Sequence, residues 1–344
     1  MVASEASLSS REHIQARTMA RNDNDMKKRA SEAGAARFLS TGNPLQFHFY
    51  EKSCPNVEKI VRQVVSSAVA SEARMAGSLL RLHFHDCFVQ GCDASLLLKT
   101  IPGVMEGEHE ALPNLNSVRG FEVVDAIKAA LEQECPGIVS CADILALAAR
   151  DSVAVSGGPS YPVQLGRRDS LTANRELANK NLPGFNFNVT DLVAGFANVG
   201  LSTRDMVALS GGHSIGKARC NTFAARLTPD PQDPTALSSY YSSSLQQQCP
   251  AGAASDALVD LDVTTPIQFD NAYYSNLLTN RGLLHSDQVL YSTPGATRDL
   301  VSLYAQSNSA FAKDFVAAML KMGRITPLTG SEGQVRNQCG YVNA

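Results

Sequence analysis

Hydrophobic positions recur with a helical period from about residue 53 to the end of the chain. The first clear stripe has the i, i+3, i+4, i+7, i+8, i+11 spacing with which one face of a helix meets a core; it consists of Val57, Ile60, Val61, Val64, Val65 and Ala68. Similar stripes predict helices near 123–131, 144–147, 192–196, 206–209, 273–277, 300–304 and 311–319. Strand patterns are few and short, so the predicted fold class is mainly α.

Polar residues beside these stripes predict where helices begin and end. Thr190 or Asp191 is expected to cap the helix through Leu192. Ser202 and Asp205 have the spacing of a capping box, with Asp in place of the usual Glu. The pair Gly211-Gly212 is expected to end the short helix that follows, which leaves His213 at its C-terminal edge.

Composition narrows the protein class. The chain has 344 residues, of which 44% are hydrophobic, and this is enough to bury a sizeable core. A formal net charge of −3 gives no electrostatic case for a nucleic-acid partner. No apolar run approaches the ~18 residues of a membrane span.

Residues 1–43 are polar and of mixed charge, and no apolar core of a secretory signal is visible among them. We therefore expect a disordered segment at 1–43 and one folded domain at 44–344.

Eight cysteines are spread along the chain, which fits four disulfides and an oxidising compartment. Eight cysteines allow about 105 pairings, so spacing alone does not assign them.

The stretch Arg81-Leu-His-Phe-His85-Asp-Cys87 concentrates chemistry in seven residues. On a helix, Arg81 and His85 lie at i and i+4 on one face. A permanent cation beside a titratable imidazole can stabilise an anion while the imidazole takes a proton.

This stretch belongs to an ordered series of motifs. The series contains Ser53-Cys-Pro-Asn56, Arg81-Leu-His-Phe-His-Asp-Cys-Phe-Val-Gln-Gly-Cys-Asp-Ala-Ser95, Pro113-Asn114, Val139-Ser-Cys-Ala-Asp143, Leu209-Ser-Gly-Gly-His-Ser-Ile-Gly216, Phe269-Asp-Asn-Ala-Tyr-Tyr274 and Ser286-Asp-Gln288. With these motifs, residues from about 45 to 342 resemble the secreted plant haem peroxidases, often called class III. The resemblance implies two helical halves that sandwich one haem b, with minor short β strands.

The resemblance also implies roles for individual residues. His213 matches the axial ligand of the haem iron, and Asp287 matches the carboxylate that accepts its other ring N–H. His85 matches the base that moves the peroxide proton, and Arg81 the cation that stabilises the developing charge. Asn114 matches the acceptor of the second ring N–H of His85. Phe84 matches the pocket wall, and Pro183 matches the residue whose carbonyl holds a phenolic donor, whereas His83 is expected to point elsewhere.

Two calcium ions are implied in the same way, because the matching residues supply the oxygen ligands that Ca²⁺ prefers. The first set is Asp86, Val89, Gly91, Asp93 and Ser95, with Glu108 through water; the second is Ser214, Asp262, Thr265, Gln268 and Asp270. The implied disulfides are Cys54–Cys135, Cys87–Cys92, Cys141–Cys339 and Cys220–Cys249.

The implied activity is reduction of hydrogen peroxide to water with one-electron oxidation of phenolic or other small aromatic donors. Such an enzyme serves peroxide catabolism, the response to oxidative stress, and possible coupling of lignin or other cell-wall phenols. We expect a monomer that is secreted to the cell wall or vacuole, and Asn188-Val-Thr190 is one glycosylation sequon.

Three alternatives remain at this point. An intracellular ascorbate-type peroxidase shares the Arg and His arrangement, but it does not need eight cysteines. His83, His85, Cys87 and Cys92 are a zinc-ligand set of unusual spacing. A haem protein without turnover is the third, although Arg81 and His85 are both present.

Overall fold

The computed structural model describes residues 44–250 and 255–344. The expected disordered segment at 1–43 lies outside the described residues. The helices are α2 (Val57–Ser71), α3 (Met75–Cys87), α4 (Phe121–Glu134), α5 (Cys141–Val155), α6 (Arg175–Asn181), α7 (Val189–Asn198), α8 (Thr203–Ser210), α9 (Ser239–Gln248), α10 (Ala272–Leu278), α11 (His285–Ser292), α12 (Ala296–Gln306) and α13 (Asn308–Met322). Short 3-10 helices include η1 (Ser95–Leu97), η2 (Glu108–Glu110), η3 (Gly211–Ser214), η4 (Cys220–Thr222) and η5 (Ala224–Arg226). The mainly α class is confirmed.

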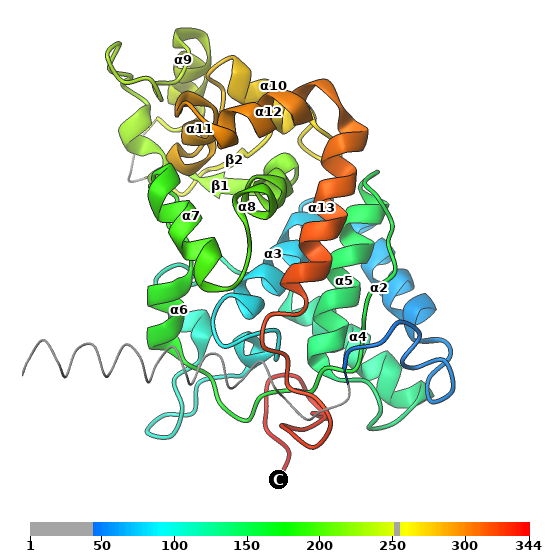
Figure 1. Ribbon diagram of the computed structural model, residues 1–344. Coiled ribbons are helices and arrows are strands. Elements are labelled where there is room, and N and C mark those ends of the chain that lie inside the picture. Colours follow the sequence, from blue (N-terminus) through cyan, green and yellow to red (C-terminus); the bar gives the residue numbers. More distant parts are fainter. Residues whose placement is uncertain (1–43, 251–254) are drawn as a thin grey trace, which may run out of the picture. The chain divides into compact units, whose positions relative to one another are not determined.

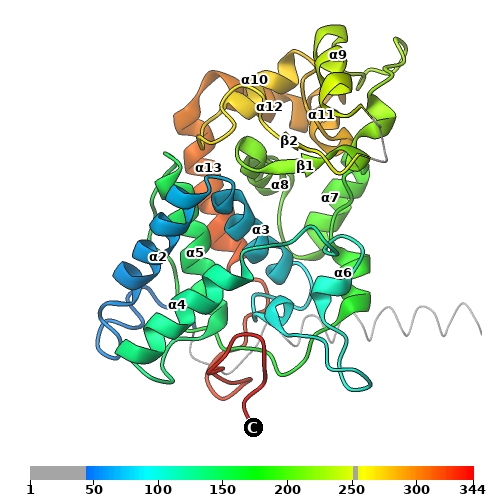
Figure 2. The ribbon, with the colours of Figure 1, turned by 180° about the vertical axis from the view of Figure 1, so that it is seen from behind.

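The helices of residues 44–344 form two groups (Figure 1). Helices α2, α3, α4 and α5 pack on one another, and α8, α10, α11 and α12 pack in a second group. Helix α13 packs on both α8 and α12, and the view from behind shows α8 close to one end of α3 (Figure 2). The buried residues of both groups form one large hydrophobic cluster, which therefore holds the two groups together.

The described strands are β1 (Lys217–Arg219) and β2 (Leu258–Asp260), which pair antiparallel. They lie beside a smaller hydrophobic cluster that surrounds the Cys220–Cys249 disulfide. The other disulfides are Cys54–Cys135, Cys87–Cys92 and Cys141–Cys339, so all four pairs are those that the family resemblance implies.

Helix ends agree with the sequence in part. Ser202 caps α8 and forms a capping box with Asp205, as predicted. The cap expected at Thr190 or Asp191 is wrong, because Asn188 caps α7 and accepts from the backbone N–H of Asp191. An asparagine is an equally good cap, and it stands one helical turn earlier than the first buried leucine.

The helix before His213 does end at the two glycines, but not through a left-handed glycine. Gly211 has φ −63 and continues into η3. A Cβ at Gly211 would lie 2.5 Å from Phe311 and from the Tyr274 hydroxyl, so the glycine permits close packing here. The 3-10 turn that follows carries His213.

Candidate active site

Helix α3 positions Arg81 and His85 one turn apart on the same face. The Arg81 Nε donates to His85 Nε2 at 3.0 Å, so the two side chains are in direct contact. The other end of the guanidinium donates to the Pro113 carbonyl at 2.9 Å and to Ser117 Oγ at 3.1 Å. Sequence reasoning did not single out Ser117, although it follows the Pro113-Asn114 motif closely. These bonds tie the arginine to the loop that carries Asn114.

The hydrogen bonds around His85 define its tautomer. A guanidinium can only donate, so His85 Nε2 carries a lone pair and Nδ1 carries the proton. Nδ1 therefore donates to Asn114 Oδ1, at 2.5 Å. The Asn114 amide is itself oriented, because its Nδ2 donates to the Glu108 carbonyl at 2.8 Å. The imidazole is thus held as a neutral base whose lone pair lies beside Arg81.

Burial controls the protonation of this pair. Burial lowers the pKa of His85 well below its usual value, the Arg81 charge lowers it further, and the bond to Asn114 opposes both. Burial, with a contribution from Arg74, lowers the pKa of Arg81 to about 10. At neutral pH the site therefore combines an uncharged imidazole with a charged guanidinium.

The neighbouring aromatic and histidine residues divide between two faces of α3. Phe84 is partly exposed and packs on Phe88, with ring centroids 4.3 Å apart. His83 is buried away from the Arg81 face, with its Nδ1 3.6 Å from Cys87 Sγ. Within the described part of the chain, His83, Cys87 and Cys92 form a potential metal-ligand group. The two cysteines form a disulfide with each other, however, so the zinc alternative is wrong.

His213 lies on η3 and contacts a buried carboxylate. Its Nδ1 and Asp287 Oδ1 are 2.7 Å apart, and Asp287 is 2% exposed. Asp287 also accepts from the Tyr273 hydroxyl and from the Leu284 backbone N–H, each at 3.0 Å. Burial alone would raise the pKa of Asp287, but the electrostatic interaction with His213 and the hydrogen bonds from His213, Leu284 and Tyr273 together outweigh it, so that pKa is lowered. Tyr273 was quoted in the sequence motifs without a role, and Leu284 was not singled out.

Close backbone packing joins α3 to the segment after His213. A Cβ at Gly77 would lie 3.0 Å from the Gly216 Cα, and one at Gly212 would lie 3.4 Å from Leu80. Gly216 has φ +104, a conformation that favours glycine. The helix that carries Arg81 and His85 is therefore packed directly against the backbone around His213.

His213 and Asp287 together fit a haem. The Asp287 carboxylate accepts a hydrogen bond from the Nδ1–H of His213, so the free lone pair of the ring is on Nε2. No described residue hydrogen-bonds this Nε2, and the side chain is 39% exposed. An imidazole with a free lone pair and a carboxylate behind it is the donor that haem iron requires.

A first group of buried oxygen atoms follows α3. The Ser95 Oγ and Glu108 Oε2 are buried without a hydrogen-bond partner among the described residues. Burial, followed by the charge of Asp93, raises the pKa of Asp86 well above its usual value; burial raises the pKa of Asp93 to about 6 and that of Glu108 to about 8. The buried Arg336 lowers the pKa values of Asp93 and Glu108, but both remain raised beside it. This group of buried oxygen atoms therefore fits a further hard cation such as Ca²⁺. Val89 and Gly91 lie on the same segment.

A second group of oxygen atoms follows His213. Ser214 Oγ donates to the Gln268 carbonyl at 3.0 Å and accepts from the Asp270 N–H at 3.1 Å. Thr265 Oγ1 bridges two carboxylates, at 3.4 Å from Asp262 and 3.0 Å from Asp270. All five residues expected for the second site are thus brought together, and their donor chemistry also fits Ca²⁺.

Pro183 lies in the segment between α6 and α7 and is partly exposed. No described residue donates to its carbonyl, and the next residue but one, Phe185, is 46% exposed. The segment is fastened to α11 through a hydrogen bond from the Ser286 N–H to the Phe185 carbonyl at 3.0 Å. Pro183 therefore lies on a segment connected to the element that carries Asp287.

Among the described residues, no helix combines the length and apolar character needed to cross a membrane.

Comparison with known proteins gives one consistent result. The family model described as Peroxidase matches residues 61–307. Peroxidase 15 of Ipomoea batatas is 54% identical over 301 residues, which cover 86% of this chain and 91% of the relative. Peroxidase 4 of Vitis vinifera is 52% identical, with coverage of 88% and 94%. The lignin-forming anionic peroxidase of Nicotiana sylvestris is also 52% identical, with coverage of 86% and 90%.

Proposed function

The chain belongs to the peroxidase family, and from this premise we propose that Arg81, His85 and His213 carry its reaction. The protein is a haem-dependent peroxidase that reduces hydrogen peroxide. We assign it one haem b, held by His213 with Asp287 behind it, and two calcium ions in the two oxygen groups. The single observation that carries the proposal is the contact between Arg81 Nε and His85 Nε2, with His85 Nδ1 fixed on Asn114.

Arg81, His85 and Asn114 supply the acid–base chemistry. When bound, haem supplies the iron on which the peroxide oxygen–oxygen bond is broken. The His85 Nε2 lone pair takes a proton from one peroxide oxygen and returns it to the other, which leaves as water. The Arg81 guanidinium stabilises the negative charge that develops as the bond breaks. Asn114 holds the ring so that Nε2, and not Nδ1, faces the peroxide.

The organic substrate is a phenol or another small aromatic donor, oxidised in successive one-electron steps. One relative of comparable identity is named a lignin-forming peroxidase, and this supports donors of that class. The Pro183 carbonyl has no partner among the described residues, so it is available to accept a hydrogen bond from a phenol hydroxyl. Phe84, partly exposed beside His85, forms the wall that keeps bulky donors from the reacting oxygen.

We propose that the protein is a monomer with its peroxidase domain at residues 44–344, and that it is secreted to the cell wall or located in the vacuole. Four disulfides favour an oxidising compartment over the cytosol, and therefore disfavour the ascorbate-type alternative. Asn188 is exposed, as a glycosylation site must be.

The variant His85→Ala tests the assignment. It should bind haem with an unchanged visible spectrum but react with peroxide at least ~100-fold more slowly, the low end of the effect for a lost acid–base group. The control is His48→Asn, because His48 is exposed and has a positive φ that asparagine tolerates. Stopped-flow rates that are equal in both variants would remove His85 from the mechanism.

A further inference from the structure

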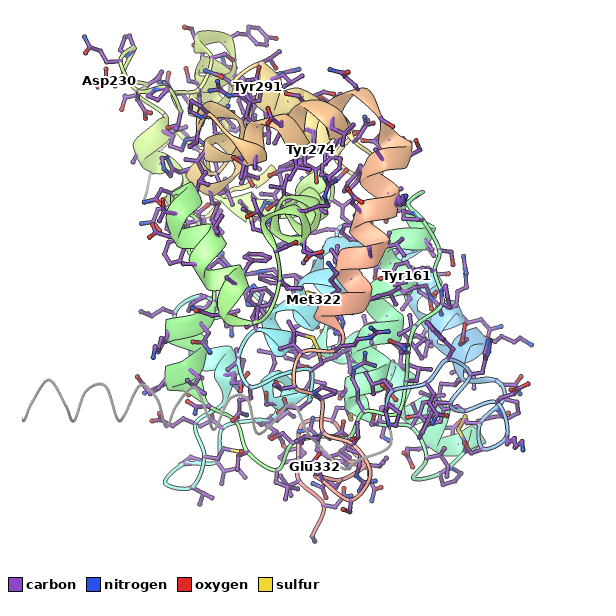
Figure 3. The ribbon with its side chains drawn as sticks, in the orientation of Figure 1. Tyr161, Asp230, Tyr274, Tyr291, Met322 and Glu332 are labelled. Carbon is purple, nitrogen blue, oxygen red and sulfur yellow. A yellow bond between two sulfur atoms is a disulfide. The ribbon has the colours of Figure 1, made fainter. Side chains whose placement is uncertain are left out.

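Three tyrosine rings form a continuous series that begins beside His213. The ring centroids of His213 and Tyr273 are 6.2 Å apart. Tyr273 and Tyr274 follow at 4.9 Å, and Tyr274 and Tyr304 at 5.1 Å. The series therefore leads from the proposed iron ligand through α10 to α12 without a gap between rings. Figure 3 labels Tyr274, which lies between these helices and α8.

Each hydroxyl in the series has a defined acceptor. The Tyr273 hydroxyl donates to Asp287 at 3.0 Å, and the Tyr304 hydroxyl donates to Asp314 Oδ2 at 2.7 Å. The Tyr274 hydroxyl donates to the Val207 carbonyl at 2.8 Å. All three rings are fully or almost fully buried. Both ends of the series thus have a carboxylate, whereas the middle ring has only a carbonyl.

Packing alone does not call for hydroxyl groups at these positions. The adjoining core is built from phenylalanines, since Phe311 contacts both Tyr274 and Tyr304. A buried hydroxyl has a desolvation cost that a phenylalanine avoids. A phenol differs from a phenyl ring in a second way, because it can lose an electron easily when a base takes its proton.

Asp314 provides an exit for that proton. The Asp314 side chain is 20% exposed and forms an ion pair with the Arg204 guanidinium at 2.8 Å. The Arg204 side chain is 57% exposed. A proton that reaches Asp314 can therefore exchange with water. At the other end, Asp287 is 2% exposed and already accepts from His213, so a proton placed there has no comparable exit.

We propose that Tyr273, Tyr274 and Tyr304 form an electron-transfer route from the haem to a second oxidation site at Tyr304. The route rests on the proposed function, since hydrogen peroxide is the oxidant that leaves an oxidising equivalent at the haem. One electron passes from Tyr304 through Tyr274 and Tyr273 to the haem, and the phenolic proton of Tyr304 moves to Asp314. Tyr304 becomes a neutral phenoxyl radical. Because its ring is buried, a phenolic donor at the surface beside Asp314 restores it: one electron passes from the donor to the ring, Asp314 returns a proton, and the donor's proton goes to water.

Electron paramagnetic resonance tests the route directly. The holoenzyme is mixed with one equivalent of peroxide without donor, freeze-quenched, and compared with a sample that contains ring-deuterated tyrosine. Wild type should give a tyrosyl signal that narrows on deuteration. In Tyr304→Phe, the Tyr304 component should disappear. In Tyr274→Phe, the Tyr304 component should also disappear, and the peroxide-oxidised haem spectrum should decay several-fold more slowly.

The matched control is Tyr161→Phe, because Tyr161 is also buried but lies beside α5, well apart from Tyr274 (Figure 3). It should leave the signal and the decay unchanged. Asp314→Asn keeps all three rings and removes the basic carboxylate, together with its ion pair to the exposed Arg204. It should therefore weaken the Tyr304 signal even if a tyrosine variant folds poorly.

The outcomes separate the route from the proposed function. A wild-type haem spectrum that does not respond to peroxide would refute the proposed function itself. A normal peroxide response with a tyrosyl signal that is unchanged in Tyr304→Phe, Tyr274→Phe and Asp314→Asn would refute the route alone, and would leave these tyrosines as core residues.

Discussion

Replacing Asp287 by asparagine is the most informative perturbation of the site around His213. The carboxylate is 2% exposed and accepts three hydrogen bonds, from His213, Tyr273 and Leu284. An asparagine oxygen can still accept from His213 and Tyr273, but its NH₂ group then faces the Leu284 N–H. Two buried donors that face each other cost about 1–3 kcal/mol, and we expect Asp287→Asn to lower the free energy of unfolding by that amount.

The functional effect of Asp287→Asn has a separate cause. The negative charge behind His213 makes the ring more electron-donating, and loss of such a partner costs about 10–100-fold in metal affinity or activity. We therefore expect a higher haem reduction potential, faster haem loss and a peroxide reaction slowed within that range. Redox titration, haem transfer to an acceptor protein and stopped-flow spectroscopy measure the three effects.

The control for Asp287→Asn is Ser286→Ala. Ser286 stands on the same turn, and its hydroxyl forms no hydrogen bond with a described residue. Its replacement should change the free energy of unfolding by no more than about 0.5 kcal/mol. If Asp287→Asn matched this control in potential, haem loss and rate, the reasoning that links Asp287 to His213 would be refuted.

Three further outcomes are expected. Because burial lowers the pKa of His85 well below 6.5, the base stays unprotonated through that pH, and the rate constant for peroxide should fall only at lower pH; a half-maximal loss near pH 6.5 would contradict this. Calcium-free protein should be less stable at pH 8 than at pH 5. Burial raises the pKa of Glu108 to about 8 and that of Asp93 to about 6, so the folded state binds more protons than the unfolded chain, and stability is lost as pH rises through those values. Calorimetry with and without chelator should show that calcium removes this loss. Replacing both Cys141 and Cys339 by alanine opens a loop of 198 residues, and chain entropy predicts a loss of about 5 kcal/mol in urea unfolding; a loss below that of the five-residue Cys87–Cys92 loop, about 2 kcal/mol, would contradict the entropic account.

Helices with a clear apolar stripe were predictable from the sequence, whereas mainly polar helices were not. Helix α2 buries Val57, Val61 and Val65, all members of the predicted stripe. Helix α9 consists mainly of serine and glutamine and buries Tyr241, Ser242 and Leu245, so its stripe is too weak to recognise. Helix α6 buries only Ala178, and α11 buries polar Asp287 and Gln288 beside two apolar residues, so neither has a recognisable stripe. Helices α8 and α10 are as short, but their apolar residues were recognised.

The arrangement of Arg81, His85 and Asn114 was also partly predictable. A helical period of 3.6 residues places Arg81 and His85 in contact whatever the rest of the fold does. The match to known motifs also pointed to Asn114, but only the folded loop shows that the Glu108 carbonyl orients its amide. Ser117, which also contacts Arg81, has no motif of its own and needed the structure.

By itself, the sequence determined the class of fold, the neighbouring Arg81 and His85, and the family to which the ordered motifs belong. These properties depend on local backbone geometry or on residue identity in order along the chain. The tertiary structure alone decided other contacts over long separations: Arg81 with Ser117 across 36 residues, and the tyrosine series that begins at Tyr273. Such contacts are set by the packing of the whole core, and no local period of the chain encodes them.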